Sequence, residues 1–161
     1  MTMSAIRKTA AGLVAAGLIA GAAGSAAAQD AGPDTKIENR QDTMAIAGAT
    51  MKTLACSVKN EGCPRGFDFL AVQARAMAFS AHLSEYAFKD GPFPDATVET
   101  TALPKIWDEW DSFEKGLRTM RQNALAMVEA AGDEDMQAFT AAFKKTGKAC
   151  KDCHDDYRED D

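Results

Sequence analysis

The sequence predicts an all-α protein, an antiparallel up-down-up-down four-helix bundle. After about residue 34 the apolar residues recur in alternating steps of three and four, which is the period of a helix that buries one face. Glycine and proline interrupt this period only between four long stretches, and no strand is expected. Helices of about 25 residues with short connections favour antiparallel neighbours, so the bundle is the simplest arrangement.

The first two helices are predicted from their apolar stripes. The first runs from about Thr35 to Val58, and the second is stopped by Gly91-Pro92. The first stripe is Ile37, Met44, Met51 and Val58, with Ala47 and Leu54 beside it. The second stripe is Phe69, Val72, Ala76, Phe79, Leu83 and Tyr86.

The last two helices follow a long connection that ends near Leu103. The third is expected to open at Pro104, a favourable first-turn residue, and to end at Gly132. Asp133 is the expected N-cap of the fourth. The third stripe is Ile106, Trp110, Phe113, Leu117, Met120, Ala124 and Met127, and the fourth is Met136, Phe139, Phe143, Cys150, Cys153 and Tyr157.

The amino terminus is typical of a secretory signal peptide over residues 1–28. Arg7 and Lys8 form a basic start, residues 10–22 are apolar, and small residues precede Gln29. A retained anchor is disfavoured because the apolar run is shorter than the ~20 residues of a spanning helix. Residues 29–34 are then a flexible lead-in, and residues 35–161 form one domain that is free of the membrane after cleavage.

The charge balance of the exported chain bears on its partners. Cleavage removes Arg7 and Lys8, so 18 basic residues become 16 against 24 acidic ones, a formal charge of −8. This balance argues against nucleic acid and anionic lipid as partners. A docking protein is expected to present a basic face.

The pentad Cys150-Lys151-Asp152-Cys153-His154 indicates a covalent haem c site. Each thiol adds to one vinyl group of the haem, and the following histidine is then held under the ring with a nitrogen toward iron. On a helix, Cys150, Cys153 and His154 share one face. A thiol oxidoreductase is a remote alternative, because its Cys-x-x-Cys motif requires a strand-turn-helix context.

The pentad and its surroundings resemble the class II c-type cytochromes, which include cytochrome c′ and its low-spin relatives. The similarity covers nearly the whole exported chain and includes residues 40–44, 104–107, 146–149 and 155–158. The resemblance implies a four-helix bundle with one haem c near one end of the core, and His154 as the proximal iron ligand. It also implies a periplasmic role in electron transfer or small-gas binding, and relatives often form homodimers through their first two helices.

By the same resemblance, Met44 covers the other face of the haem. If its thioether ligates iron, the haem is low-spin and suited to electron transfer, which is the interpretation favoured here. If Met44 only blocks the face, iron stays five-coordinate and binds nitric oxide or carbon monoxide. Without the resemblance, packing of Met44 in the core would be the simpler explanation.

Two arginines are further candidates for cofactor binding. Arg40 occupies a stripe position where an apolar residue is expected, so a haem propionate is its expected partner, although an arginine that reaches solvent past its own stem is an alternative. Arg158 matches a residue that flanks the proximal haem side in the family, or it is a favourable C-terminal helix charge. No set of acid and base groups on the inward stripes indicates an enzyme.

Cys56 and Cys63 have no counterpart in the usual family pattern. They bracket a turn-prone stretch between the first two helices, and an exported chain permits oxidation. The sequence therefore predicts a disulfide that closes a short loop.

Overall fold

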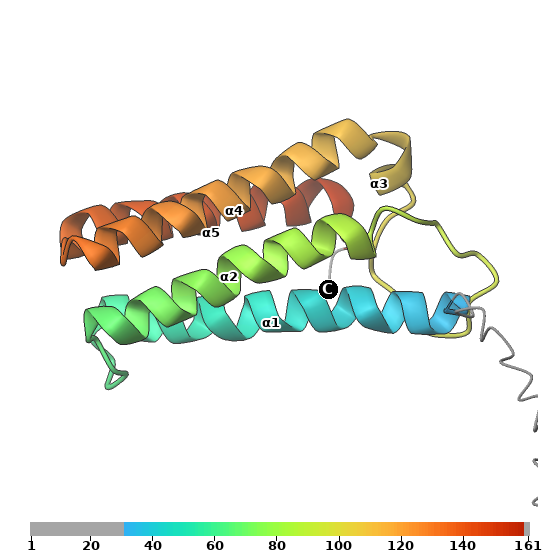
Figure 1. The fold of residues 1–161 in the computed structure, drawn as a ribbon. Coiled ribbons are helices and arrows are strands. Elements are labelled where there is room, and N and C mark those ends of the chain that lie inside the picture. Colours follow the sequence, from blue (N-terminus) through green and yellow to red (C-terminus); the bar gives the residue numbers. More distant parts are fainter. Residues whose placement is uncertain (1–30, 160–161) are drawn as a thin grey trace, which may run out of the picture. The chain divides into compact units, whose positions relative to one another are not determined.

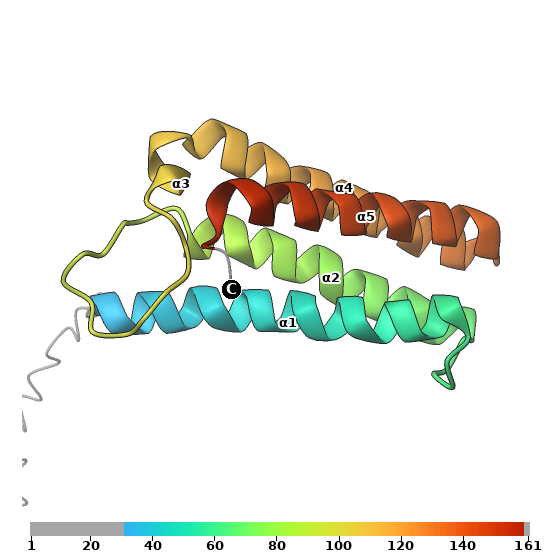
Figure 2. The same cartoon turned by 180° about the vertical axis from the view of Figure 1, so that it is seen from behind.

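The computed structural model describes residues 31–159, which form four long helices and one short one. The helices are α1 (Pro33–Lys59), α2 (Phe67–Ala87), α3 (Lys105–Asp108), α4 (Trp110–Gly132) and α5 (Met136–Tyr157). The four long helices run antiparallel in sequence order, as Figures 1 and 2 show from opposite sides. Between residues 31 and 159 the only β-pairing is an isolated bridge, so the all-α four-helix prediction is confirmed. The predicted signal peptide, residues 1–28, lies outside the described residues.

The long helices pack in the order α1, α2, α4 and α5, and the first and last of them barely contact each other. α2 packs against α1 and α4, and α4 packs against α5, whereas α5 barely contacts α1. Buried residues form a large core toward the end of the bundle that carries the α1–α2 connection. A smaller, aromatic core lies toward the other end. The larger core includes Leu54, Leu70, Met77, Met127 and Phe139, and the smaller one comprises Phe88, Ile106, Phe113, Leu117 and Tyr157. None of the helices within residues 31–159 is sufficiently long and apolar to span a bilayer.

The predicted apolar stripe of the second helix is wrong. Val72, Phe79 and Tyr86 are 58%, 61% and 67% exposed, so this stripe faces outward. The buried face of α2 consists instead mostly of small residues: Leu70, Ala74, Met77, Ala78, Ser80, Ala81 and Ser84. The hydroxyls of Ser80 and Ser84 donate to backbone carbonyls one turn earlier, so they are buried at little cost. Small side chains let α2 approach both neighbours closely, and this decides which face is buried.

The third predicted helix is broken in two. Its stripe is buried as expected at Ile106, Phe113 and Leu117, but Glu109 has non-helical backbone angles (φ −119°, ψ 36°) and separates α3 from α4. The Glu109 carboxylate accepts a hydrogen bond from the Tyr157 hydroxyl at 3.1 Å. The break therefore lies where the third segment is tied to the end of α5.

The N-cap of α5 lies two residues beyond the predicted one. Asp135, not Asp133, caps the helix: its carboxylate accepts from the backbone N–H groups of Gln137 and Ala138, both at 2.9 Å. Asp133 belongs to the end of α4, and Glu134 between them has a positive φ of 55°. The turn needs these extra residues to reverse the chain.

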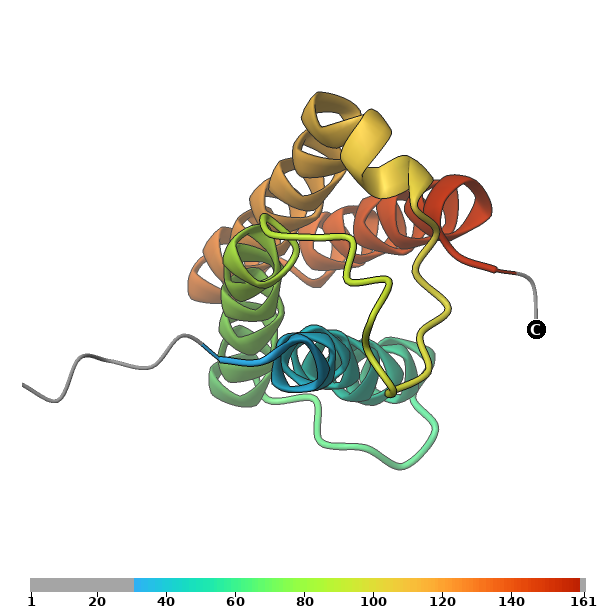
Figure 3. The ribbon, with the colours of Figure 1, turned by 90° about the vertical axis from the view of Figure 1, so that its right-hand side faces the viewer.

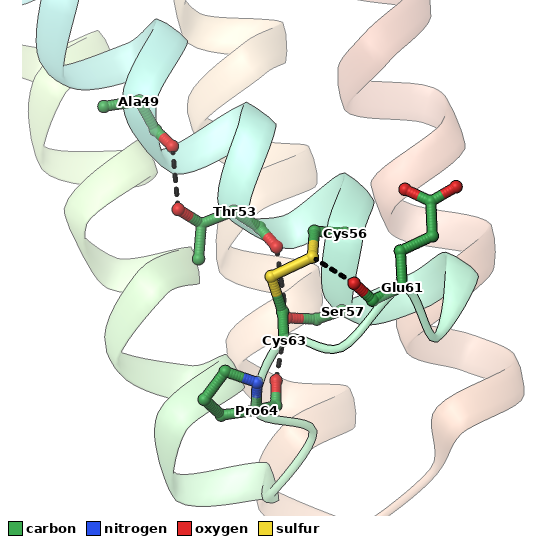
Figure 4. Close-up of a disulfide and its surroundings, with 7 residues drawn as sticks. All are labelled: Ala49, Thr53, Cys56, Ser57, Glu61, Cys63 and Pro64. Atoms are coloured by element: carbon green, nitrogen blue, oxygen red, sulfur yellow. Dashed lines mark hydrogen bonds between the residues drawn. A yellow bond between two sulfur atoms is a disulfide. The ribbon is translucent and has the colours of Figure 1, made fainter.

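The predicted disulfide between Cys56 and Cys63 is present, with Cα atoms 5.6 Å apart (Figure 4). It closes the α1–α2 connection, at the far end of the bundle from α3. Just beyond the closed loop, Pro64 O accepts a hydrogen bond from the Ser57 hydroxyl at 2.7 Å, as Figure 4 also shows. The disulfide thus holds the beginning of α2 against the last turn of α1.

The long connection between α2 and α3 is fastened to α1 by one buried arginine. Arg40 is 3% exposed, and its Nε donates to Ala87 O at 2.9 Å while Nη2 donates to Asp90 O. Its guanidinium carbon lies 4.6 Å from the centre of the Phe93 ring and 4.8 Å from that of Trp107. Burial lowers the pKa of the Arg40 guanidinium. Because the group has five donors and no acceptor, carbonyl partners are what its burial requires.

Other residues of α1 hold the rest of this connection, which crosses the end of the bundle in Figure 3. The Asp34 carboxylate accepts from the backbone N–H and hydroxyl of Thr97, at 2.6 and 2.7 Å, and from Val98 N at 3.2 Å. The hydroxyl of Thr97 is the main cause that lowers the pKa of Asp34. Gln41 Nε2 donates to Glu99 O at 2.8 Å. The first turns of α1 therefore position residues 88–104.

Removing the disulfide is predicted to destabilise the fold without disturbing the other end. In the variant Cys56→Ser/Cys63→Ser, the free energy of unfolding should fall by about 2.5 kcal/mol, the value expected for freeing a loop of this length. Urea denaturation of wild type and variant measures the change. A variant as stable as the oxidised wild type would contradict a stabilising role for the disulfide.

Removing the Arg40 guanidinium is predicted to release the connection. Arg40→Met should lower the free energy of unfolding by about 3 kcal/mol, because two carbonyls lose their donors in a buried setting. Arg40→Lys should recover only part of this loss, since an ammonium cannot serve both carbonyls and stack on the rings.

The same urea experiment with limited proteolysis at residues 88–104 checks this prediction. The matched control is Arg118→Met, whose side chain is 58% exposed on α4 and which should change stability by less than about 0.5 kcal/mol. Equal effects of the two substitutions would show that the contacts of Arg40 contribute no more than those of a surface arginine.

Candidate functional site

A cavity of about 470 Å³ opens between α1, α4, α5 and the connection before α3. Its lining is mostly apolar and brings together residues more than 100 positions apart in sequence. All six predicted site residues line it: Arg40, Met44, Cys150, Cys153, His154 and Arg158. Because α5 barely contacts α1, the space between these helices is available to a flat group.

One wall is formed by the pentad on α5. Cys150, Cys153 and His154 are spaced by three and four residues on a continuous helix, so their side chains leave the same face. Both thiols are free and half-buried. Burial raises the pKa of the Cys150 thiol, and it raises that of Cys153 to about 11. The two thiols are therefore neutral near pH 7, next to an apolar cavity.

The facing wall comes from α1 and carries thioethers. Met44 is half-buried and packs against the smaller aromatic core, and Met51 lies two turns further along. Met120 of α4 also lines the cavity. Met44 and His154 therefore line one cavity from two different helices.

Two glycines show that the cavity has room that side chains would otherwise fill. Gly48 on α1 and Gly116 on α4 both line it, and a Cβ at either position would meet no atom within 4 Å. An apolar space with two thiols and an imidazole on one wall fits a haem c. When bound, such a group supplies an iron centre that exchanges an electron or takes a small ligand.

The rim of the cavity is built by the end of the connection and the end of α5. Ala102 and Arg158 form an antiparallel bridge, Leu103 N donates to Tyr157 O at 3.0 Å, and Glu159 N donates to Thr101 O at 2.9 Å. Burial, followed by the hydrogen bond to Glu109, raises the pKa of the Tyr157 phenol. These bonds fix Arg158 at the edge of the cavity, four residues after His154.

Sequence reasoning did not find several lining residues. Phe88, Thr100, Thr101 and Ala102 belong to the connection, and no periodic pattern marks their positions. His82, the other histidine of the chain, does not line the cavity, and its Nδ1 is 3.3 Å from Arg121 Nη1 on α4. The buried character of Arg40 was signalled by its place on an apolar stripe, but its carbonyl partners were not.

The family model and the relatives that match this chain all indicate the same protein family. The model of the family described as Cytochrome C′ matches residues 35–158. The chain is 32% identical to cytochrome c′ of Halomonas halodenitrificans over 129 residues, which are 78% of this chain and 97% of that protein. It is 30% identical to cytochrome c-554 of Cereibacter sphaeroides, over 84% of this chain and 89% of that protein.

Solved structures agree with this assignment. The structure of cytochrome c′ from Thermochromatium tepidum matches with a TM-score of 0.71 and 27% identity, over 81% of this chain and 99% of that one. A nitric oxide complex of a mutant cytochrome c prime from Alcaligenes xylosoxidans matches with a TM-score of 0.70 and 26% identity, over 81% and 98%. The predicted cofactor, one covalently bound haem c, is confirmed by this relationship. The chain belongs to the cytochrome c′ family, the class II c-type cytochromes.

Proposed function

We propose that Cys150 and Cys153 attach the haem through thioethers and that His154 is the proximal iron ligand, in a protein that works in the periplasm. The observation that carries the proposal is that these three side chains line one wall of an apolar cavity on a single helix face. The cavity is large enough to take a cofactor, and its facing wall is furnished by Met44. Export, expected from residues 1–28, is what haem attachment to these thiols requires.

We propose further that the iron is five-coordinate and binds nitric oxide or carbon monoxide, with Met44 covering the face opposite His154. The matching family model and several relatives are described as cytochrome c′, and two similar structures are nitric oxide complexes. The packing of Met44 supports a covering role, because its side chain is held against the aromatic core. Residues Gly48 and Gly116 leave space in the cavity that a small ligand can use.

Electron transfer by a low-spin haem with Met44 as sixth ligand is the second candidate. It is favoured by the thioethers of Met44, Met51 and Met120, all of which line the cavity that contains His154. A thioether ligand would raise the reduction potential and keep the coordination unchanged on reduction. The two candidates differ only in whether the sulfur of Met44 reaches iron.

Both arginines are proposed to serve the haem propionates. Arg40 uses two of its N–H donors on Ala87 O and Asp90 O, and a guanidinium has five, so donors remain for an anionic group at the cavity. Arg158 is fixed at the rim by the bridge to Ala102. A propionate held at this edge would leave the apolar ring against Phe113 and Leu117.

A homodimer through the outer face of α2 is also proposed. Val72, Phe79 and Tyr86 are exposed on this face, and Ile46 of α1 is 44% exposed. From residue 69 to residue 84 the only full charge is Arg75, in a strongly acidic chain. A second copy can therefore approach this face without the repulsion that the rest of the surface would produce.

The spin state separates the two candidates for iron coordination. In the ferric holoprotein we expect a high-spin electron paramagnetic resonance spectrum, and rapid carbon monoxide binding to the ferrous form, because Met44 covers iron without binding it. Met44→Leu should leave the ferric spin state unchanged, and Met44→Ala should speed carbon monoxide binding about tenfold by opening the face, a change of 1.4 kcal/mol in barrier.

Met120→Leu is the matched control for the effect of altering a cavity methionine. It should leave both the spin state and the carbon monoxide rate within about twofold of the wild type. A low-spin wild type that becomes high-spin only in Met44→Leu would establish the electron-transfer alternative instead.

Placing a charge on the α2 face is predicted to dissociate the dimer. Phe79→Glu should weaken self-association by about 100-fold or more, since a buried carboxylate would have no partner in a two-fold interface. Sedimentation equilibrium measures the change. Leu125→Glu is the control, because Leu125 is 44% exposed on α4, away from this face. A wild type that stays monomeric at high concentration would contradict the proposed dimer.

A further inference from the structure

The helix that carries the haem-binding pentad has a local charge opposite to that of the whole protein. Residues 140–151 contain four lysines, Lys144, Lys145, Lys148 and Lys151, and no acidic residue. All four lysines are exposed. The remainder of the exported chain is acidic, so the positive charge of this lysine patch differs from the charge of the rest of the protein.

The lysine patch lies on the helix that carries the pentad, on the face turned away from the cavity, and none of the four lysines lines the cavity. Lys151 follows Cys150, which lines the cavity, and Lys144 is six residues away, about 9 Å along the helix axis. Lys148 lies one residue before Ala149, another lining residue. Because an α-helix with its side chains is about 10–12 Å across, a partner on the patch would lie about one helix diameter from a group held by Cys150 and Cys153.

Two of the four lysines are paired and two are not. Lys148 and Lys151 form exposed i,i+4 ion pairs with Asp152 and Asp155, each at 2.5 Å. Exposed pairs of this kind are weak, but each aspartate offsets most of the field of its lysine at a distance, so Lys148 and Lys151 add little net charge to the patch. Within residues 31–159, Lys144 and Lys145 have no ion-pair partner. The patch thus keeps a positive charge that nearby acids do not neutralise.

We infer that the lysine patch of α5 is the docking surface for a redox partner with an acidic face. The inference rests on the proposed haem site. The net charge of −8 predicts a partner with a basic face, but association is guided by the local potential of the docking face and by the charge asymmetry of the molecule. A positive patch on the outer face of α5, on an otherwise acidic surface, orients the protein so that α5 meets an acidic partner.

The first test uses small charged oxidants with the ferrous holoprotein. Oxidation by hexacyanoferrate(III), a trianion, is compared between wild type and Lys144→Gln/Lys145→Gln at low and high ionic strength. At about 20 mM salt the variant should react about threefold more slowly, and the difference should vanish at about 0.5 M salt. With the cationic oxidant tris(phenanthroline)cobalt(III), the variant should react faster than the wild type.

The matched control is Lys59→Gln/Arg65→Gln, which removes the same charge from exposed positions at the end of α1 and in the α1–α2 connection, at the other end of the bundle. This double variant should react within about 1.3-fold of the wild type with both oxidants. If both double variants slow oxidation by hexacyanoferrate(III) equally, only the net charge of the protein affects the rate. If Lys144→Gln/Lys145→Gln does not slow it, the oxidant does not approach the protein at the lysine patch. Either result overturns the inference.

A second readout does not depend on electron transfer. In ¹⁵N nuclear magnetic resonance spectra of the holoprotein, a decaglutamate peptide should shift the amide signals of residues 140–151 at low salt, and these shifts should be reduced at least threefold in Lys144→Gln/Lys145→Gln. Shifts spread over the whole surface, or none, would overturn the inference. A Soret band in the purified protein with no patch effect refutes the docking surface alone, whereas its absence refutes the haem site.

Discussion

The buried guanidinium of Arg40 is the constraint on which the candidate site depends. A permanently charged group that is 3% exposed must find acceptors, and here it finds the carbonyls of Ala87 and Asp90 and the faces of Phe93 and Trp107. These partners belong to the end of α2, the long connection and α3. One side chain of α1 therefore gathers three segments, and the position of the connection at the mouth of the cavity follows from this.

The sequence period predicted which helices form, but it predicted the buried face of α2 wrongly. For α4, the stripe with Phe113, Leu117 and Met120 is buried as expected, because large apolar side chains coincide with the contact face. In α2 the contact face carries alanine and serine, and the large residues Phe79 and Tyr86 point outward. A hydrophobic pattern is recognised by its large apolar residues, whereas two helices that pack closely need small side chains at their contact. The exposed stripe therefore needs an explanation of its own.

Part of the site could be predicted because it is local. The pentad is contiguous on one helix, so its spacing alone defines a face. The inclusion of Met44 came from family resemblance and that of Arg40 from its place on an apolar stripe, and the structure places both on the same cavity as the pentad. The rim could not be predicted, because Thr100 to Ala102 are placed by contacts such as Asp34 with Thr97, 63 residues apart. Such contacts leave no periodic signal in the sequence.

The two ends of the bundle have different physical tasks. The end closed by Cys56 and Cys63 holds the larger core, in which Leu54, Leu70 and Phe139 are fully buried. The other end keeps a cavity, half-buried thiols and a buried cation, all of which cost stability in the protein chain alone. A haem attached through thioethers stays on the chain when it unfolds, so burial of its apolar ring and ligation of its iron in the folded state would offset that cost at this end. Chain packing at one end and the cofactor at the other would then stabilise complementary halves of the same four helices.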